Sequence, residues 1–217
     1  TRRATSSVSA GMDLTTASFM LASLPPRPAP YLPYHRPMTT IYLIRHGETP
    51  TTGKILPGRT PGLHLSERGR GQAEAVAKQL ARVDAVYASP LERARETAAP
   101  TCERFSRELL LDDGLLEADF GTWTGKSLVE LSKLPEWQVV QKRPEQFRFP
   151  GGESFVEMQE RVVGCVRGIA ARHPGEVVAC FTHADPIKAA LAHFTGRGWG
   201  AFQQIPAEPC SISELEL

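Results

Sequence analysis

The sequence lacks a long hydrophobic run, an excess of either charge and a closely spaced pair of cysteines. No apolar segment approaches the roughly 18 residues of a membrane-spanning helix, so we expect no membrane partner. The chain has 25 Lys and Arg against 24 Asp and Glu, a balance that argues against nucleic-acid binding through a net basic field. The cysteines lie far apart, at positions 102, 165, 180 and 210. We therefore predict reduced thiols and a cytoplasmic protein.

Residues 1–37 differ in composition from the rest of the chain. Ser and Thr dominate the first ten positions, and Pro recurs from position 25 onward. This composition favours a largely disordered, polyproline-type extension. A transit-like peptide is a less favoured alternative, because Met38 stands just before the first predicted strand and is the simpler candidate for the natural start. Residues 38–217 are long enough for one domain with its own core.

From residue 39 onward, strand and helix patterns alternate. Strands are predicted at 39–44, 83–88, 109–111, 177–182 and 211–217. Helices are predicted at 70–81, from 89 to about 105, near 127–133, at 154–173 and at 186–194, with a proline-broken stretch before residue 152. This order predicts an α/β fold of three layers, α/β/α, with a mostly parallel central sheet and one antiparallel edge strand.

Polar side chains follow three of the predicted strands. Arg45 and His46 come after the first, Arg93 lies shortly after the second, and His183 comes directly after the strand at 177–182. Because parallel strands end at the same edge of a sheet, these side chains should converge there. Guanidinium groups and helix N-termini bind anions, and phosphate above all. Each segment alone could be an ordinary solvated strand end, whereas the three together predict a phosphate site.

Six motifs extend this pattern along the chain. They are Arg45-His46-Gly47-Glu48-Thr49, Leu65-Ser66-Glu67-Arg68-Gly69, Ser89-Pro90-Leu91-Glu92-Arg93-Ala94, Leu116-Glu117-Ala118-Asp119-Phe120-Gly121, Pro150-Gly151-Gly152-Glu153-Ser154 and Thr182-His183-Ala184. In this order and approximate spacing, residues 39–217 resemble the histidine phosphatase superfamily, in the branch that includes phosphoglycerate mutases and α-ribazole phosphatases. The resemblance implies a phosphoglycerate mutase-like fold.

The resemblance also implies roles for five residues. His46 would be the nucleophile that becomes phosphohistidine, and Glu117 would be the general acid. The residues expected to hold the phosphoryl group are Arg45, Arg93 and His183. We expect neighbouring positive charge to keep His46 neutral, and a partly apolar setting to raise the pKa of Glu117. Taken without the resemblance, Glu117 is more simply a surface carboxylate.

Three further residues are assigned to the site less directly. Thr52 stands where the family often has Asn, and its hydroxyl is expected to meet a phosphate oxygen. Ala184 follows the second histidine in place of the usual Gly, and its backbone N–H is expected to serve equally well. Arg59 either reaches a second anionic group of the substrate or is a solvated loop residue.

These residues, with the roles that the resemblance implies, predict a metal-independent phosphatase that hydrolyses a small phosphorylated metabolite through phosphohistidine and uses no cofactor. A phosphoglycerate mutase is the alternative. Only 35 residues separate Glu117 from Gly152, and the family's mutases have a longer segment there. A non-catalytic module that binds a phosphorylated ligand is a third reading. Specificity is expected to come from residues 50–64 and 128–149, which would cover the site. The natural substrate and the assembly, including a homodimer, stay open.

Overall fold

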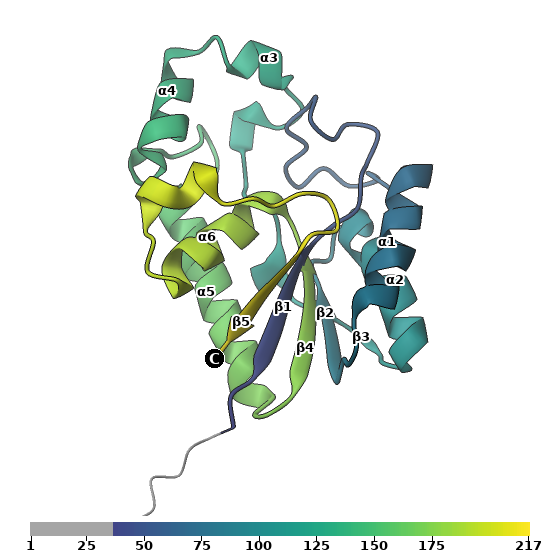
Figure 1. The fold of residues 1–217 in the computed structure, drawn as a ribbon. Helices are drawn as coiled ribbons and strands as arrows, with labels where there is room; N and C mark the ends of the chain where they lie inside the picture. Colours follow the sequence, from purple (N-terminus) through teal and green to yellow (C-terminus); the bar gives the residue numbers. More distant parts are fainter. Residues whose placement is uncertain (1–36) are drawn as a thin grey trace, which may run out of the picture. The chain divides into compact units, whose positions relative to one another are not determined.

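Residues 37–217 of the chain are described by a computed structural model. The extension predicted at 1–37 thus lies outside the described residues, apart from Pro37. The described residues contain a sheet whose strands lie in the order β3-β2-β4-β1-β5 (Figure 1). The strands are β1 (Thr40–Arg45), β2 (Ala85–Ala88), β3 (Leu109–Leu111), β4 (Val177–Thr182) and β5 (Ile212–Glu216). Only β5 is antiparallel to its neighbour, which is β1.

Helices cover both faces of this sheet. In Figure 1, α1 and α2 lie on one side of the sheet and α5 and α6 on the other. These helices are α1 (Glu67–Gln79), α2 (Glu92–Phe105), α5 (Phe155–Arg172) and α6 (Ala184–Phe194). The predicted α/β/α architecture, with one antiparallel edge strand, is therefore confirmed.

Two short helices lie in a segment above the carboxyl ends of the parallel strands (Figure 1). They are α3 (Leu128–Leu131) and α4 (Pro135–Lys142), and we call residues 128–149 the lid. The helix α4 was not predicted, since prolines in this stretch suggested a broken chain. Pro135 instead occupies the first turn of α4, where the missing N–H has no helical partner and costs nothing.

Two other helix starts differ from the prediction. The helix α6 begins at Ala184 rather than at residue 186, because a proline in the first turn is tolerated. The residue before α2 is Leu91, with no side-chain capping bond, so Ser89 is not its cap. Ser89 instead bonds to His183, as described below.

The two faces of the sheet have separate hydrophobic cores. Alternation along β1 sends Ile41 and Leu43 to the core under α5 and α6, and Ile44 to the core under α1 and α2. The first core also contains a group of aromatic rings that joins the lid to the body: Phe120, Trp123, Phe147, Phe149, Phe155 and Phe202. The lid is thereby anchored on the same core that supports the sheet.

Candidate active site

The two predicted histidines lie side by side at the carboxyl edge of the sheet. Arg45 pairs with Thr182 at the ends of β1 and β4, and the N–H of His46 donates to the carbonyl of Thr182 at 2.9 Å. The residue that follows each of these strand ends is a histidine, His46 after β1 and His183 after β4. The ring centroids of His46 and His183 are 5.2 Å apart, which confirms the predicted convergence.

The imidazole of His46 is held in one tautomer. Its Nδ1 lies 2.7 Å from the carbonyl oxygen of Gly47. Since a carbonyl only accepts, Nδ1 carries the proton and Nε2 keeps the lone pair that a nucleophile needs. Burial, followed by the charges of Arg93 and Arg45, lowers the pKa of His46 to about 3. The expectation of a neutral ring is therefore supported, with burial as the main cause rather than neighbouring charge.

The second imidazole, that of His183, is fully buried. Its Nε2 lies 2.8 Å from Oγ of Ser89, and its Nδ1 has no hydrogen-bond partner among the described residues. Burial, and then the charge of Arg93, hold the pKa of His183 well below its usual value. The site therefore contains a second neutral imidazole with one unused nitrogen.

Two arginines also carry buried polar atoms without partners. Arg93 is fully buried, and only its Nη2 is bonded, at 2.7 Å from the carbonyl of Gly58. Nε of Arg45 and both Nε and Nη1 of Arg93 lack an acceptor within the described part of the chain. Buried donors of this kind are costly unless a ligand satisfies them. These guanidiniums form a donor set suited to an oxyanion, and Nδ1 of His183 joins it in the tautomer in which Ser89 donates to Nε2.

Glu117 is buried beside this donor set. Burial and then the charge of Asp185, opposed by Arg93, raise the pKa of its carboxyl to about 7. The predicted increase is thus supported. A carboxyl that titrates near neutrality can hold a proton for a leaving group and take one back later.

Three charged residues hold the loop that carries Glu117. Nη1 of Arg161 donates to the carbonyls of Gly114 and Leu116 at 2.9 and 3.0 Å. Nε of Arg59 donates to the carbonyl of Glu117 at 2.8 Å. The carboxylate of Glu153 binds both guanidiniums, at 2.7 Å for Arg161 and 3.0 Å for Arg59. We call Arg59, Glu153 and Arg161 the loop clamp.

Sequence reasoning did not assign a role to two members of the loop clamp. Glu153 belongs to the Gly152-Glu153-Ser154 motif, so the sequence did carry a signal for it. Arg161 gave none, because an arginine within an amphipathic helix is ordinarily a solvated residue. The third member, Arg59, was predicted to bind substrate or to be solvated. Its guanidinium is instead engaged with Glu153 and the Glu117 loop.

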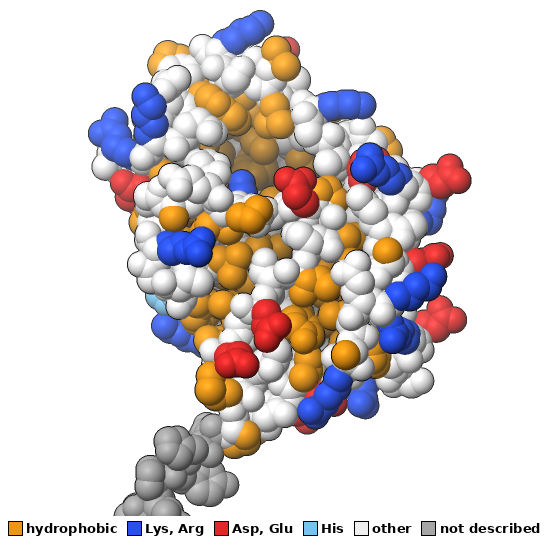
Figure 2. Space-filling model, viewed as in Figure 1, with side chains coloured by type: hydrophobic (Ala, Val, Ile, Leu, Met, Phe, Trp, Pro, Cys, Tyr) orange, Lys and Arg blue, Asp and Glu red, His pale blue; other side chains and the backbone are white. Residues whose placement is uncertain are grey.

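Three of the predicted site residues, Arg45, His46 and Glu117, line a cavity of about 270 Å³ beneath the lid. Figure 2 shows a hollow with hydrophobic side chains inside it in this region. Thr52 and Ala184 both line the cavity, whereas Arg59 does not. The apolar lining residues are Ile55, Leu56, Pro57, Phe120, Leu128, Trp137, Val140, Phe149 and Phe155.

Within residues 37–217 no helix is long and apolar enough to cross a bilayer. The same residues contain no group of three or more His, Cys, Asp or Glu side chains arranged to hold a metal ion.

Comparison with known proteins identifies the family. The family model of the histidine phosphatase superfamily (branch 1) matches residues 41–217. Phosphoserine phosphatase 1 of Hydrogenobacter thermophilus is 31% identical over 187 residues, covering 83% of this chain and 87% of that protein. A 2,3-bisphosphoglycerate-dependent phosphoglycerate mutase of Thermoplasma acidophilum is 33% identical over 165 residues, covering 74% and 78%. The solved structure of Bacillus stearothermophilus YhfR is 29% identical, with a TM-score of 0.76 and coverage of 82% and 91%.

The chain therefore belongs to the histidine phosphatase superfamily, and it is a phosphatase. The family and the fold expected from the six motifs are both confirmed.

Proposed function

We propose that the protein hydrolyses a small phosphomonoester through a phosphohistidine intermediate, without a metal ion. The observation that carries this proposal is the set of unpartnered buried nitrogens on Arg45, Arg93 and His183 beside the nucleophilic ring of His46. A phosphoryl group bound there would accept hydrogen bonds from the two arginines.

In the first step, Nε2 of His46 attacks phosphorus in line with the bond to the leaving alcohol. The P–N bond forms as the P–O bond breaks, and the departing oxygen takes the proton held by Glu117. In the second step, the oxygen of a water molecule attacks phosphorus while Glu117 accepts a proton from that water. The P–N bond then breaks, and inorganic phosphate and neutral His46 are released. The pKa of Glu117, about 7, suits both directions of transfer.

A phosphoglycerate mutase is the alternative, since one relative carries that name. The two activities would use the same residues and differ in the fate of the phosphoenzyme. Phosphate release from p-nitrophenyl phosphate, set against interconversion of phosphoglycerates, separates them. The short connection between Glu117 and Gly152 favours hydrolysis.

The test is replacement of the nucleophile. His46→Ala should lower turnover by several orders of magnitude, because loss of a covalent nucleophile removes the intermediate. Wild-type protein quenched during turnover should carry an acid-labile phosphoryl group, and the variant should not. His64→Ala is the matched control, because His64 is exposed and lies outside the cavity lining. Retention of most activity in His46→Ala would overturn the mechanism, and absence of labelling would favour a binding module.

A further inference from the structure

The cavity has charged groups that the hydrolysis step does not use. Lys188 and Asp185 line it on α6, and the Nζ of Lys188 lies 3.7 Å from Oδ1 of Asp185. Arg45 and Lys188 are the cations among the cavity-lining residues, and Arg45 belongs to the phosphate site. Within the described residues, Lys188 donates no hydrogen bond at normal distance. Its ammonium group therefore has donors available for a ligand.

The position of Lys188 relative to the phosphate site follows from helix geometry. Ala184 is the first residue of α6 and lines the cavity beside the histidine pair. Residues four apart lie on the same face of a helix, one turn or about 5.4 Å along its axis. The backbone of Lys188 thus lies one turn beyond Ala184 on the same wall of the cavity, and its ammonium group lies near the carboxylate of Asp185 in the first turn. A negative group bound there would belong to the leaving group and not to the phosphate.

The cavity that contains both groups is walled mainly by hydrophobic side chains. Leu128, Trp137 and Val140 come from the lid, and Ile55 and Leu56 come from the loop after β1. A fully polar leaving group would leave this wall facing water. A leaving group with an apolar body would bury it, which is favourable in proportion to the area covered.

We propose that the preferred substrates are phosphomonoesters whose leaving group combines an apolar body with a carboxylate, and that Lys188 binds this carboxylate. The inference rests on the proposed phosphatase function and adds the class of substrate to it. It also assigns to Lys188 the recognition of a second anionic group, for which the sequence had suggested Arg59. Because the guanidinium of Arg59 is already bound within the loop clamp, we assign that role to Lys188 on α6 instead.

The experiment compares 4-carboxyphenyl phosphate with phenyl phosphate, in wild-type protein and in Lys188→Gln. The two esters share an aryl body, so the ratio of their kcat/KM values reports the carboxylate. Lys188→Gln should lower this ratio about 10- to 100-fold, as expected for loss of a hydrogen bond to a charged group. Intrinsic differences in leaving-group reactivity cancel in the comparison of variants.

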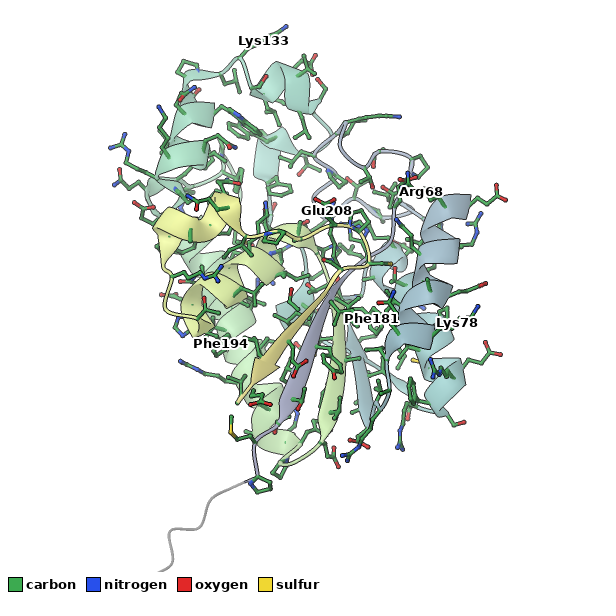
Figure 3. All side chains as sticks on the ribbon, viewed as in Figure 1. Arg68, Lys78, Lys133, Phe181, Phe194 and Glu208 are labelled. Atoms are coloured by element: carbon green, nitrogen blue, oxygen red, sulfur yellow. The ribbon has the colours of Figure 1, made fainter. Side chains whose placement is uncertain are left out.

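Two matched controls complete the design. Lys133→Gln removes an exposed lid lysine that points away from the body of the protein in Figure 3, and it should leave the ratio unchanged. Leu128→Ala should lower kcat/KM for both aryl esters about tenfold or more, as for loss of methylene groups from a hydrophobic pocket. Val129→Ala should not, since Val129 is 67% exposed on the same helix.

An unchanged ratio in Lys188→Gln would overturn the inference while leaving the phosphatase function intact. Equal kcat/KM values for phenyl phosphate and glycerol phosphate would likewise contradict the proposed role of the apolar wall. Failure of the wild-type protein to hydrolyse any of these esters would instead count against the proposed function itself.

Discussion

His46 and Glu117 owe their opposite protonation states to one cause, which is burial. Removing water penalises the charged form of each group, so the imidazole loses its proton and the carboxyl keeps one. The pKa of His46 falls to about 3 and that of Glu117 rises to about 7. Between these values the site holds a neutral His46 and a protonated Glu117 together, which is the state that the proposed formation of phosphohistidine requires.

The pH dependence of kcat/KM should follow from these two groups. Activity should fall as pH rises through about 7, because Glu117 then loses the proton it must donate. Glu117→Gln should remove this decline and lower kcat/KM for alkyl phosphates by about 10²- to 10⁴-fold, the usual contribution of a general acid. With p-nitrophenyl phosphate, whose leaving group departs without a proton, the loss should be much smaller. Equal losses for both kinds of ester would contradict the assignment of Glu117 as the acid.

At the scale of elements, the loop clamp connects α5 to the loop that carries the acid. Arg161 and Glu153 have side chains that are 22% and 15% exposed, and their ion pair also binds three backbone carbonyls of residues 114–117. A second ion pair near the start of α5, between Arg148 and Glu157, is about half exposed. Exposed pairs of that kind contribute little to stability.

Arg161→Met should lower kcat for alkyl phosphates at least tenfold while changing KM little, because it frees the loop that positions Glu117. It should also lower the free energy of unfolding by about 2 kcal/mol, since it removes the closest partner of the half-buried Glu153 carboxylate, which keeps its ion pair with Arg59. Arg148→Met is the matched control and should change both quantities slightly. Steady-state kinetics and urea denaturation measure the two effects. A normal kcat in folded Arg161→Met would show that the clamp does not position the acid.

Sequence reasoning succeeded where a pattern is local and repeated. The strands at 109–111 and 177–182 have the predicted bounds, because short apolar runs leave few alternatives. The helix α4 escaped prediction because the same proline that ends one helix can begin the next. Arg161 escaped because its burial depends on carbonyl groups from a loop more than 40 residues earlier, and no local pattern records such a contact.

For the whole molecule, burying two neutral histidines makes stability depend on pH. The folded-state pKa values of His46 and His183 lie below those of an unfolded chain, so the unfolded state binds more protons at mildly acidic pH. Glu117 acts in the opposite direction, since its raised pKa lets the folded state take up a proton first. Because the effect of the two histidines exceeds that of the one carboxyl, the free energy of unfolding decreases as pH falls.

The free energy of unfolding should therefore decrease between pH 6.5 and 5 by about 1 kcal/mol per pH unit. His46→Asn removes one of the two histidines and should make the decline shallower. His64→Asn should leave the decline in place, because Glu96 raises the pKa of His64 rather than lowering it. Urea denaturation at several pH values measures the slope. A slope that is the same in wild type and His46→Asn would contradict the account.

The position of β1 in the sheet has a consequence for how the protein is made. This strand delivers Arg45 and His46, yet both strands that hydrogen-bond to it, β4 and β5, come after residue 176. The carbonyl of Arg45 is itself bonded by the N–H of Cys210 at 3.1 Å. During synthesis, His46 emerges from the ribosome long before β4 and β5, the strands that pair with β1. The site should thus become complete only once β5 has left the exit tunnel.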